Sequence, residues 1–190
     1  VRASYLFNST IAGIDKADVI LLVGTNPRWE APVLNARIRK RHLKGGLKVA
    51  SVGGVGELTY PVEMLGAGAE TLGQIASGGH SFAETLKNAK APMIIVGQGA
   101  LTRPDGTAVL GMARKLADSF NVVRDGWNGF NVLQIAASRV GGLELGFVPQ
   151  AGGRDVAGIL DGAQKGDIDV VYLLAADEID YLMDAFTKLG

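Results

Sequence analysis

The sequence predicts an α/β fold with a mostly parallel, doubly wound sheet and helices on both faces. Apolar runs of strand length occur at Val19–Val23, Met93–Val96 and Val170–Leu174. Such continuous runs are typical of strands that are buried on both faces of a parallel sheet. Segments with helical spacing of apolar residues separate the runs, and this alternation favours parallel pairing of the strands.

One strand–turn–helix unit is the clearest. The strand Val19–Val23 is followed by the turn Gly24–Pro27, and a helix can begin at Pro32 because proline needs no hydrogen bond in a first turn. Leu34 and Ile38 follow at helical spacing, and basic residues gather toward the helix end, where they oppose the helix dipole. Ligands bind at the carboxyl ends of strands in open α/β sheets, so this turn is a candidate site.

The remaining elements are more weakly marked. We expect Ile11 and Ile14 to face inward, a strand at Lys48–Val52, a loop over Glu57–Gly68 and a helix at Thr71–Ala76. Two further helices follow, one opened by the capping pair Ser81 and Glu84 and one capped by Asp105.

The second half of the chain is expected to continue in the same way. A short strand at Asn121–Val123 and a turn at Asp125–Gly129 precede a helix that contains Val132, Leu133, Ile135 and Ala136 and ends at Gly141–Gly142. A connection over Phe147–Arg154 leads to a helix with Val156, Ile159, Leu160 and Ala163, a last strand at Asp169–Ala176 and a final helix with Ile179, Leu182, Met183 and Phe186.

Composition limits the possible functions. The 190 residues include 27 glycines, and 19 basic residues balance 19 acidic ones, so net charge gives no reason to expect nucleic acid or an anionic membrane as a partner. The absence of cysteine excludes disulfides, iron–sulfur ligands and a cysteine nucleophile within these residues. No apolar run approaches the roughly 20 residues that span a bilayer. The length is compatible with one domain or two small lobes, and we expect one α/β domain over residues 1–190. Because the chain opens on Val1 rather than Met, we expect it to be a fragment of a longer polypeptide.

The polar residues that follow strands are the candidate ligand contacts. Gly24, Thr25 and Asn26 come after the first buried strand, and Asp177 follows the last one, so they could line one crevice. Glycine turns can hold phosphate through backbone N–H groups, but none here completes a dinucleotide fingerprint or a P-loop. The reading we favour is that glycine serves only the strand-to-helix turns and that Asp177 is a helix cap.

No catalytic or metal-binding constellation is evident. His42 and His80 lie far apart in sequence without cysteine or paired carboxylates nearby, whereas a metal site needs three or four converging ligands. Trp29 and Trp127 fall in predicted loops, where each could anchor an interface or fold back onto its own loop. We therefore assign no catalytic residue and no metal ligand.

Several segments together resemble a known protein family. They are Tyr5–Ile14, Gly24–Arg28 and Glu30–Lys40, with further matches at Leu58–Tyr60, Gln74–Gly78 and Leu173–Asp177. The chain resembles the C-terminal, molybdopterin-oxidoreductase-like region of the G-subunit family of NADH:quinone oxidoreductase, respiratory complex I. The resemblance implies a domain within an enzyme that passes electrons from NADH to quinone, on the cytoplasmic side of the bacterial inner membrane or, alternatively, on the matrix side in mitochondria.

The same resemblance implies what the domain holds and what it contacts. In molybdenum enzymes of this kind, the loop matching Gly24–Pro27 touches a pterin guanine dinucleotide, and the loop after the next strand carries an acid followed by Pro and Arg. Here that loop reads Val52–Gly56, with neither acid nor arginine. We therefore expect a structural, non-catalytic domain without cofactor, whose partners are the rest of the G subunit, where the iron–sulfur clusters lie, and other peripheral-arm subunits. The alternatives are an active molybdopterin enzyme fragment, with Gly24, Thr25, Asn26 and Asp177 at the nucleotide end, and a nucleotide- or flavin-binding module.

Overall fold

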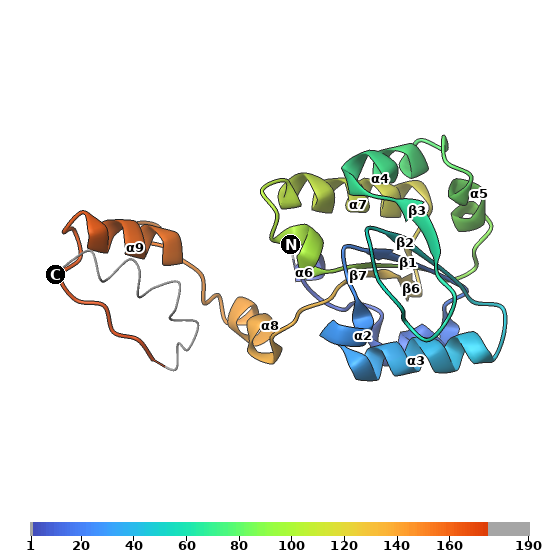
Figure 1. Cartoon of the computed structure of the whole chain (residues 1–190), viewed down its shortest axis with the longest axis horizontal. Helices are drawn as coiled ribbons and strands as arrows, with labels where there is room; N and C mark the ends of the chain where they lie inside the picture. Colours follow the sequence, from blue (N-terminus) through green and yellow to red (C-terminus); the bar gives the residue numbers. More distant parts are fainter. Residues whose placement is uncertain (1, 175–190) are drawn as a thin grey trace. The chain divides into compact units, whose positions relative to one another are not determined.

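The computed structural model describes residues 2–174 of the chain (Figure 1). The chain divides into two compact units, residues 1–140 and 141–190, where the sequence predicts one domain over residues 1–190.

A five-stranded parallel sheet forms the centre of the first unit. Its strands are β1 (Val19–Val23), β2 (Lys48–Val52), β3 (Glu63–Gly66), β4 (Pro92–Val96) and β7 (Phe130–Val132), in the order β3-β2-β1-β4-β7. Val19 of β1 is paired with Lys48 of β2 and with Pro92 of β4, so the three central strands begin in register. All five residues of β1 are buried, as predicted for a strand covered on both faces.

Helices cover both faces of this sheet, which confirms the predicted fold class. Figure 1 shows α4, α5 and α7 on one face, with α2 and α3 on the other. The helices of the unit are α1 (Thr10–Gly13), α2 (Pro27–Glu30), α3 (Pro32–Leu43), α4 (Gly68–Ala76), α5 (Phe82–Lys87), α6 (Gln98–Leu101) and α7 (Gly106–Ser119), with short 3₁₀ turns at Arg2–Ser4 and Ile14–Lys16.

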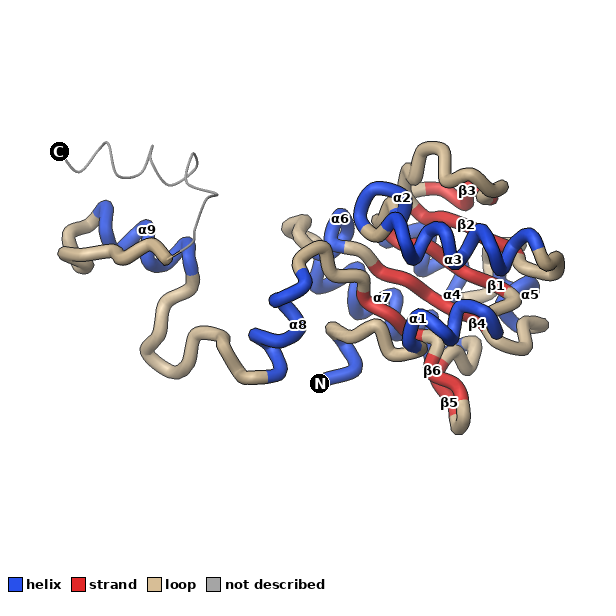
Figure 2. The backbone as a smooth tube through the Cα atoms, turned by 90° about the horizontal axis from the view of Figure 1, so that it is seen from below, coloured by secondary structure: helices blue, strands red, loops and turns tan. Residues whose placement is uncertain are grey.

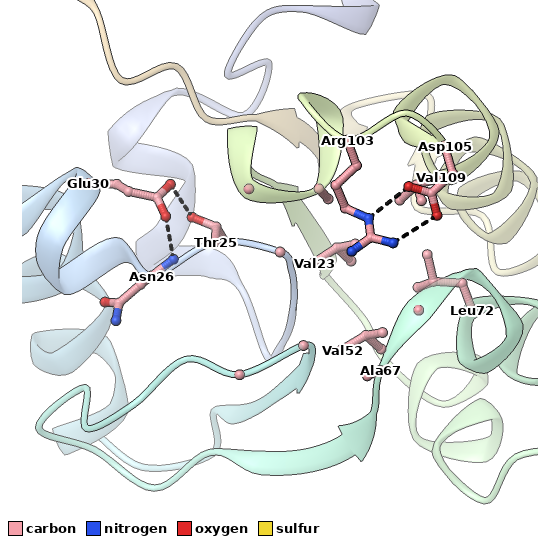
Figure 3. A pocket seen from close by; sticks show the side chains of 16 residues that line it. Val23, Thr25, Asn26, Glu30, Val52, Ala67, Leu72, Arg103, Asp105 and Val109 are labelled. Carbon is pink, nitrogen blue, oxygen red and sulfur yellow. Dashed lines mark hydrogen bonds and ion pairs between the residues drawn. The ribbon is translucent and has the colours of Figure 1, made fainter.

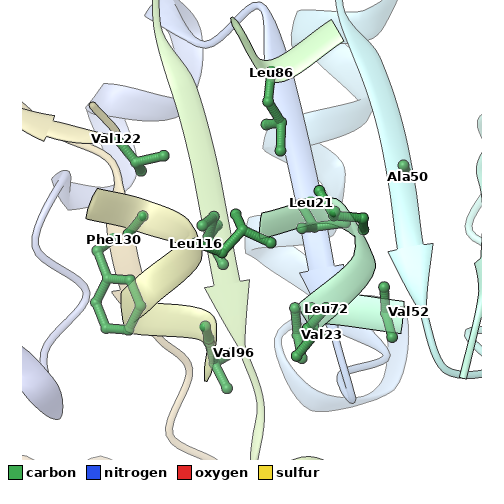
Figure 4. Packing of buried hydrophobic residues seen from close by; sticks show 14 of the residues in the cluster. Leu21, Val23, Ala50, Val52, Leu72, Leu86, Val96, Leu116, Val122 and Phe130 are labelled. Carbon is green, nitrogen blue, oxygen red and sulfur yellow. The ribbon is translucent and has the colours of Figure 1, made fainter. Parts of the chain in front are cut away.

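Successive side chains of β1 point to opposite faces of the sheet and so contribute to two separate apolar clusters. Leu21 and Val23 point to the face covered by α4, α5 and α7, where they join Leu72, Leu116 and Phe130 (Figure 4). A fully buried side chain of this size contributes roughly 1.5–3 kcal/mol to folding. This face therefore contains the larger of the two apolar clusters of the described residues and fixes α4 and α7 above the sheet.

The opposite face is covered by α3, which lies in front of the strands in Figure 2. Ile20 and Leu22 pack there with Ile38 of α3. A buried polar pair fastens the loop after β2 to this helix, because the Tyr60 hydroxyl donates to Asn35 Oδ1 (2.7 Å) and Asn35 Nδ2 donates to the Leu58 carbonyl (3.1 Å). Burial raises the pKa of Tyr60, so its phenol stays protonated and remains a donor.

Two edge strands of the sheet correct the sequence prediction. The segment Glu57–Gly68, expected to be loop, contains β3, and the expected helix over Val132–Ala136 begins instead as β7. β3 and β7 are only four and three residues long; β3 pairs with β2, and β7 pairs with β4 and is also bridged through Asn131 to Phe7 of the N-terminal segment. Strands this short have no periodicity of their own, so tertiary pairing decides them. The helix that follows, α8, spans Ala137–Glu144.

Three smaller expectations are also corrected. Val123 belongs to an antiparallel hairpin of β5 (Val123–Arg124) and β6 (Trp127–Asn128) rather than to the main sheet, so the expected turn after it is partly strand. Ser81 accepts no capping hydrogen bond; the Phe82 N–H instead donates to His80 Nδ1 (3.1 Å). Ile14 is fully buried as predicted, whereas Ile11 is 52% exposed.

The second unit contains α9 (Val156–Gln164), which confirms the helix predicted there, after an irregular connection over 147–155. The strand expected at Asp169–Ala176 is wrong over the described residues 169–174, which form no strand. Val170, Tyr172 and Leu174 are about four-fifths exposed (82%, 84% and 78%). An apolar run becomes a strand only where a sheet edge pairs with it, and no described strand does so here. The predicted final helix lies outside the described residues.

Candidate functional site

A crevice of about 360 Å³ opens at the carboxyl ends of β1 and β2 (Figure 3). This volume lies at the low end of the roughly 300–1,000 Å³ of small-molecule sites. Apolar side chains of the strands and of α4 and α7 line one part, and polar groups from three turns line the rest. The labelled residues are Val23, Thr25, Asn26, Glu30, Val52, Ala67, Leu72, Arg103, Asp105 and Val109. Gly24, Thr25 and Asn26 thus line the crevice where the sequence places a site.

The carboxylate of Glu30 occupies the donors of this turn. Thr25 Oγ1 donates to Glu30 Oε2 (2.8 Å), and the Asn26 backbone N–H donates to Glu30 Oε1 (2.6 Å), as the dashed lines in Figure 3 show. Thr25 is only 2% exposed, so its hydroxyl depends on this partner. Hydrogen bonds to an ionised acceptor are among the strong ones. The Glu30 carboxylate therefore occupies the position at which this turn could bind an anionic group of a ligand.

Asn26 is likewise committed to the fold. Its side-chain Oδ1 caps α2 by accepting from the backbone N–H groups of Arg28 (3.1 Å) and Trp29 (3.4 Å). Its Nδ2 donates to the Val55 carbonyl (2.7 Å) in the loop after β2. The amide is thus satisfied on both sides and connects the turn after β1 to the turn after β2.

The turns after β1 and β4 touch each other closely. Gly24 has a φ of +55°, and a Cβ on it would meet Ala100 Cβ at 2.5 Å. A Cβ on Gly97 would come within 2.8 Å of the Gly24 carbonyl oxygen. Real side chains do not tolerate contacts this short, so glycine here serves backbone packing between the two turns. The predicted glycine role in turn formation is therefore seen at these positions.

Arg103 and Asp105 form the charged border of the crevice. Arg103 Nε donates to Asp105 Oδ1 (2.7 Å) and Nη2 donates to Oδ2 (3.2 Å). The Arg103 guanidinium lowers the pKa of the Asp105 carboxyl. This pairing also explains why Asp105 makes no side-chain cap at the start of α7, contrary to the sequence prediction. Two guanidinium nitrogens of Arg103 bind the two carboxylate oxygens of Asp105, so the positive charge of Arg103 is already paired within the chain.

These residues do not fit the diphosphate of a pterin guanine dinucleotide. Glu30 and Asp105 contribute two negative charges against the single positive charge of Arg103, so the ionisable lining is net negative. The donors of the turn bind Glu30, and the Gly24 turn is closed against Ala100. An anion would have to displace a carboxylate and approach another one. The crevice therefore lies where a nucleotide site is found in such a sheet, but its ionisable lining is net negative and not positive.

Sequence reasoning missed the residues that decide this chemistry. Glu30 was not singled out, although a carboxylate four residues after a helix-capping Asn could have suggested it. Arg103 was also missed, since its role depends on the turn that brings it back to Asp105. Asp177 lies outside the described residues, so its convergence with Asn26 stays a prediction.

The histidines and tryptophans that the sequence offers as candidates form no metal-binding group in the part of the chain that the structure describes. Within the described residues, no group of three or more His, Cys, Asp or Glu side chains could hold a metal ion. His42 is partly buried, with its ring 6.2 Å from that of Tyr60. Trp127 folds back, donating its indole N–H to the Pro92 carbonyl (2.8 Å), whereas Trp29 is 82% exposed. Trp127 therefore takes the second of the two roles that the sequence leaves open, whereas an interface role for Trp29 stays a prediction.

Comparison with known proteins gives the family. The sequence profile of the molybdopterin oxidoreductase family matches residues 1–187. The NADH-quinone oxidoreductase G subunit of Rickettsia bellii (strain RML369-C) is 46% identical over 187 residues, which are 97% of this chain and 26% of that protein. The protein of the same name from Rickettsia conorii (strain ATCC VR-613 / Malish 7) is 43% identical over 180 residues, 95% of this chain and 25% of that protein. The chain spans about a quarter of the length of the curated relatives it matches. With a profile match over nearly the whole chain and a parallel sheet with its crevice at the strand ends, this chain belongs to the molybdopterin oxidoreductase family.

Proposed function

We propose that this chain is the molybdopterin-oxidoreductase-like region of a G subunit of NADH–quinone oxidoreductase and acts there as a structural domain. Relatives with that name match 95–97% of the chain at 43–46% identity. The domain itself carries out no redox step. Its contribution is to pack against the rest of the polypeptide and against neighbouring subunits of the peripheral arm of complex I.

The single observation that carries the non-catalytic role is the Glu30 carboxylate. It receives hydrogen bonds from Thr25 and Asn26 at the strand-end turn, where a nucleotide cofactor would need those donors. A domain that retained a cofactor would keep these groups free for it. The parallel sheet is the scaffold of the domain, and the hydrogen bonds to Glu30 tie the turn after β1 into this scaffold.

Cofactors and location follow from the same proposal. The chain has no cysteine, so the iron–sulfur clusters of the proposed G subunit would be held by its N-terminal part. Among residues 2–174, no helix is long and apolar enough to cross a membrane. We propose that the domain lies on the cytoplasmic side of the bacterial inner membrane and reaches the membrane only through the complex.

Purification of the tagged full-length protein from solubilised host membranes tests this proposal. We expect NADH:quinone oxidoreductase activity and iron to copurify, with molybdenum and released guanine nucleotide far below one per protein. Stoichiometric molybdenum with guanine nucleotide would overturn the structural role and favour an active molybdopterin enzyme. Absence of NADH oxidation from the purified material would overturn the assignment to complex I. Flavin or another nucleotide released from the 190-residue chain would favour a nucleotide-binding module.

A further inference from the structure

The outer face of α3 carries an exposed stripe that begins in an apolar groove. Val33, Ala36, Lys40, Leu43 and Lys44 recur at three- and four-residue spacing, so they lie along one side of the helix. All five are exposed, with Val33 at 77% and Leu43 at 67%. We call this stripe, together with the groove, the α3 ridge. It is apolar at the start of the helix and cationic at its end.

The groove at the start of the ridge has a volume of about 380 Å³. Its lining includes Phe7, Ile11, Val33, Val132 and Leu133, from the N-terminal segment, α3 and the end of β7. Of its described lining residues, Gln134 alone is polar, and its amide is already used: Nε2 donates to the Tyr5 carbonyl (3.2 Å), and Oε1 accepts from Gln98 Nε2 (3.1 Å). The groove therefore suits a large apolar side chain and offers no free polar partner.

Charge at the other end of the ridge selects an acidic neighbour. Lys40 and Lys44 form no salt bridge with a described residue, whereas Arg37 on the adjacent side is neutralised by Asp15. Residues 1–140 contain 16 Lys or Arg and 10 Asp or Glu, a net charge of +6. Acidic side chains placed along Lys40 and Lys44 would face both a local and an overall positive potential.

We propose that the α3 ridge is the docking surface for another part of the same longer polypeptide. The docking segment places a large apolar side chain in the groove and acidic side chains beside Lys40 and Lys44. This inference rests on the proposed function, since the relatives that support it are about four times as long as this chain. A tethered segment reaches an exposed apolar surface at an effective concentration of about millimolar, ahead of any free partner.

The ridge is less suited to the other possible occupants. A symmetric dimer through the same patch would bring two copies of the cationic stripe together, and like charges across an interface cost affinity. Nucleic acid would gain from the lysines but not from the apolar groove, which lies on the same stripe. A polypeptide segment with both apolar and acidic side chains satisfies both ends.

Photocrosslinking in the full-length protein tests the proposal. A benzophenone amino acid replaces Val33 or Leu43 in two variants, and Lys115 on the exposed face of α7 in a third, which is the control. After illumination in the purified native complex, crosslinked peptides are mapped by mass spectrometry. We expect both ridge probes to map to one segment of the same polypeptide outside residues 1–190, and the control probe not to reach that segment. Crosslinks from the ridge to a second copy, to another polypeptide or to nucleic acid, or no crosslink, would overturn the inference.

Charge reversal supplies a second measurement. Lys40→Glu with Lys44→Glu should lower the yield of the Val33 crosslink about tenfold, because two interfacial attractions become repulsions. Lys87→Glu with Lys115→Glu makes the same change in net charge elsewhere and should leave the yield unchanged. Equal effects of both pairs would overturn the electrostatic part. The crosslink is intramolecular, so it can form even where NADH oxidation does not copurify, and failure of the ridge is therefore distinguishable from failure of the proposed function.

Discussion

Glu30 shows how one side chain changes the use of a strand-end turn. Its carboxylate accepts from the buried hydroxyl of Thr25 and from the Asn26 backbone, so it closes the turn after β1 onto α2. The same two donors would otherwise need water or a ligand. The electrostatic character of the crevice is thus set by a residue that contributes to no strand.

The first prediction concerns this carboxylate. Glu30→Gln replaces two charge-assisted hydrogen bonds by weaker ones and leaves Thr25 poorly satisfied, so we expect a loss of about 1–3 kcal/mol in the free energy of unfolding. Denaturant unfolding followed by circular dichroism measures it. Glu84→Gln, which removes only a surface contact to Lys87 at 3.6 Å, should change stability by less than about 0.5 kcal/mol. Similar losses for both variants would contradict the role given to Glu30.

The second prediction concerns the contact between the two turns. Gly97→Ala places a methyl group against the Gly24 carbonyl oxygen and should destabilise the protein by about 1–3 kcal/mol, as overpacking does. Gly111→Ala is the matched control, because a Cβ there meets nothing within 4 Å in the interior of α7. Alanine in a helix interior is favoured over glycine by roughly 0.5–1 kcal/mol, so that variant should be more stable. Thermal unfolding of the two variants should therefore shift in opposite directions.

At the scale of elements, Asp15 and Arg37 join the turn before β1 to α3. Arg37 Nε and Nη2 donate to the two oxygens of Asp15 (3.0 and 2.5 Å). The hydrogen bond from Arg37, and its charge, lower the pKa of the Asp15 carboxyl. A carboxyl with a lowered pKa in the folded state stabilises that state above its unfolded pKa and loses this contribution as pH falls through the folded pKa.

The third prediction follows from the lowered pKa of the Asp15 carboxyl. The difference in unfolding free energy between the unmodified chain and Asp15→Asn should be full near neutral pH and shrink as pH falls below about 3.9, the unfolded value. Urea titrations across this range measure it. Asp118→Asn removes an exposed carboxylate 3.7 Å from Arg114 and serves as the comparison. The same pH dependence in both variants would argue against a specific role of the Asp15–Arg37 pair.

The elements also show how far sequence alone can go. β1 and β4 were predictable because their residues are buried on both faces and each run carries its own signal, whereas β2, with Lys48 exposed and the next four residues buried, gives a weaker signal. β3 and β7 were not, since short edge strands exist only through their neighbours. The two expected caps fail for different reasons: Ser81 has helical backbone angles (φ −55°, ψ −31°) in place of the extended cap conformation, and the Asp105 carboxylate pairs with Arg103. At the site, the position of Gly24–Asn26 was predictable from the strand, whereas the partners of their polar atoms depend on three-dimensional packing.

At the scale of the whole molecule, charge is divided between the two units. The net charge of zero hides +6 in residues 1–140 and −6 in residues 141–190, which contain 3 Lys or Arg and 9 Asp or Glu. The unit 1–140 also contains all five strands of the main sheet and both apolar clusters. It therefore has the core that independent folding requires.

The fourth prediction is that residues 1–140 fold alone. We expect a single cooperative thermal transition by circular dichroism, because the fragment loses no residue of either apolar cluster. At neutral pH the fragment should bind a cation exchanger that the 190-residue chain does not retain. A broad, non-cooperative transition would show instead that residues 141–190 are needed for the fold.

The closed contact between the turns after β1 and β4 has a consequence for engineering. Removing the Glu30 carboxylate would free two donors, yet Gly24 would still be packed against Ala100, so this turn could not accept a side chain at that position. Widening that contact alone would leave the carboxylate in place to repel a phosphate. If the domain holds no cofactor, as proposed, then building a nucleotide site here would require both changes together, and no single substitution would supply one.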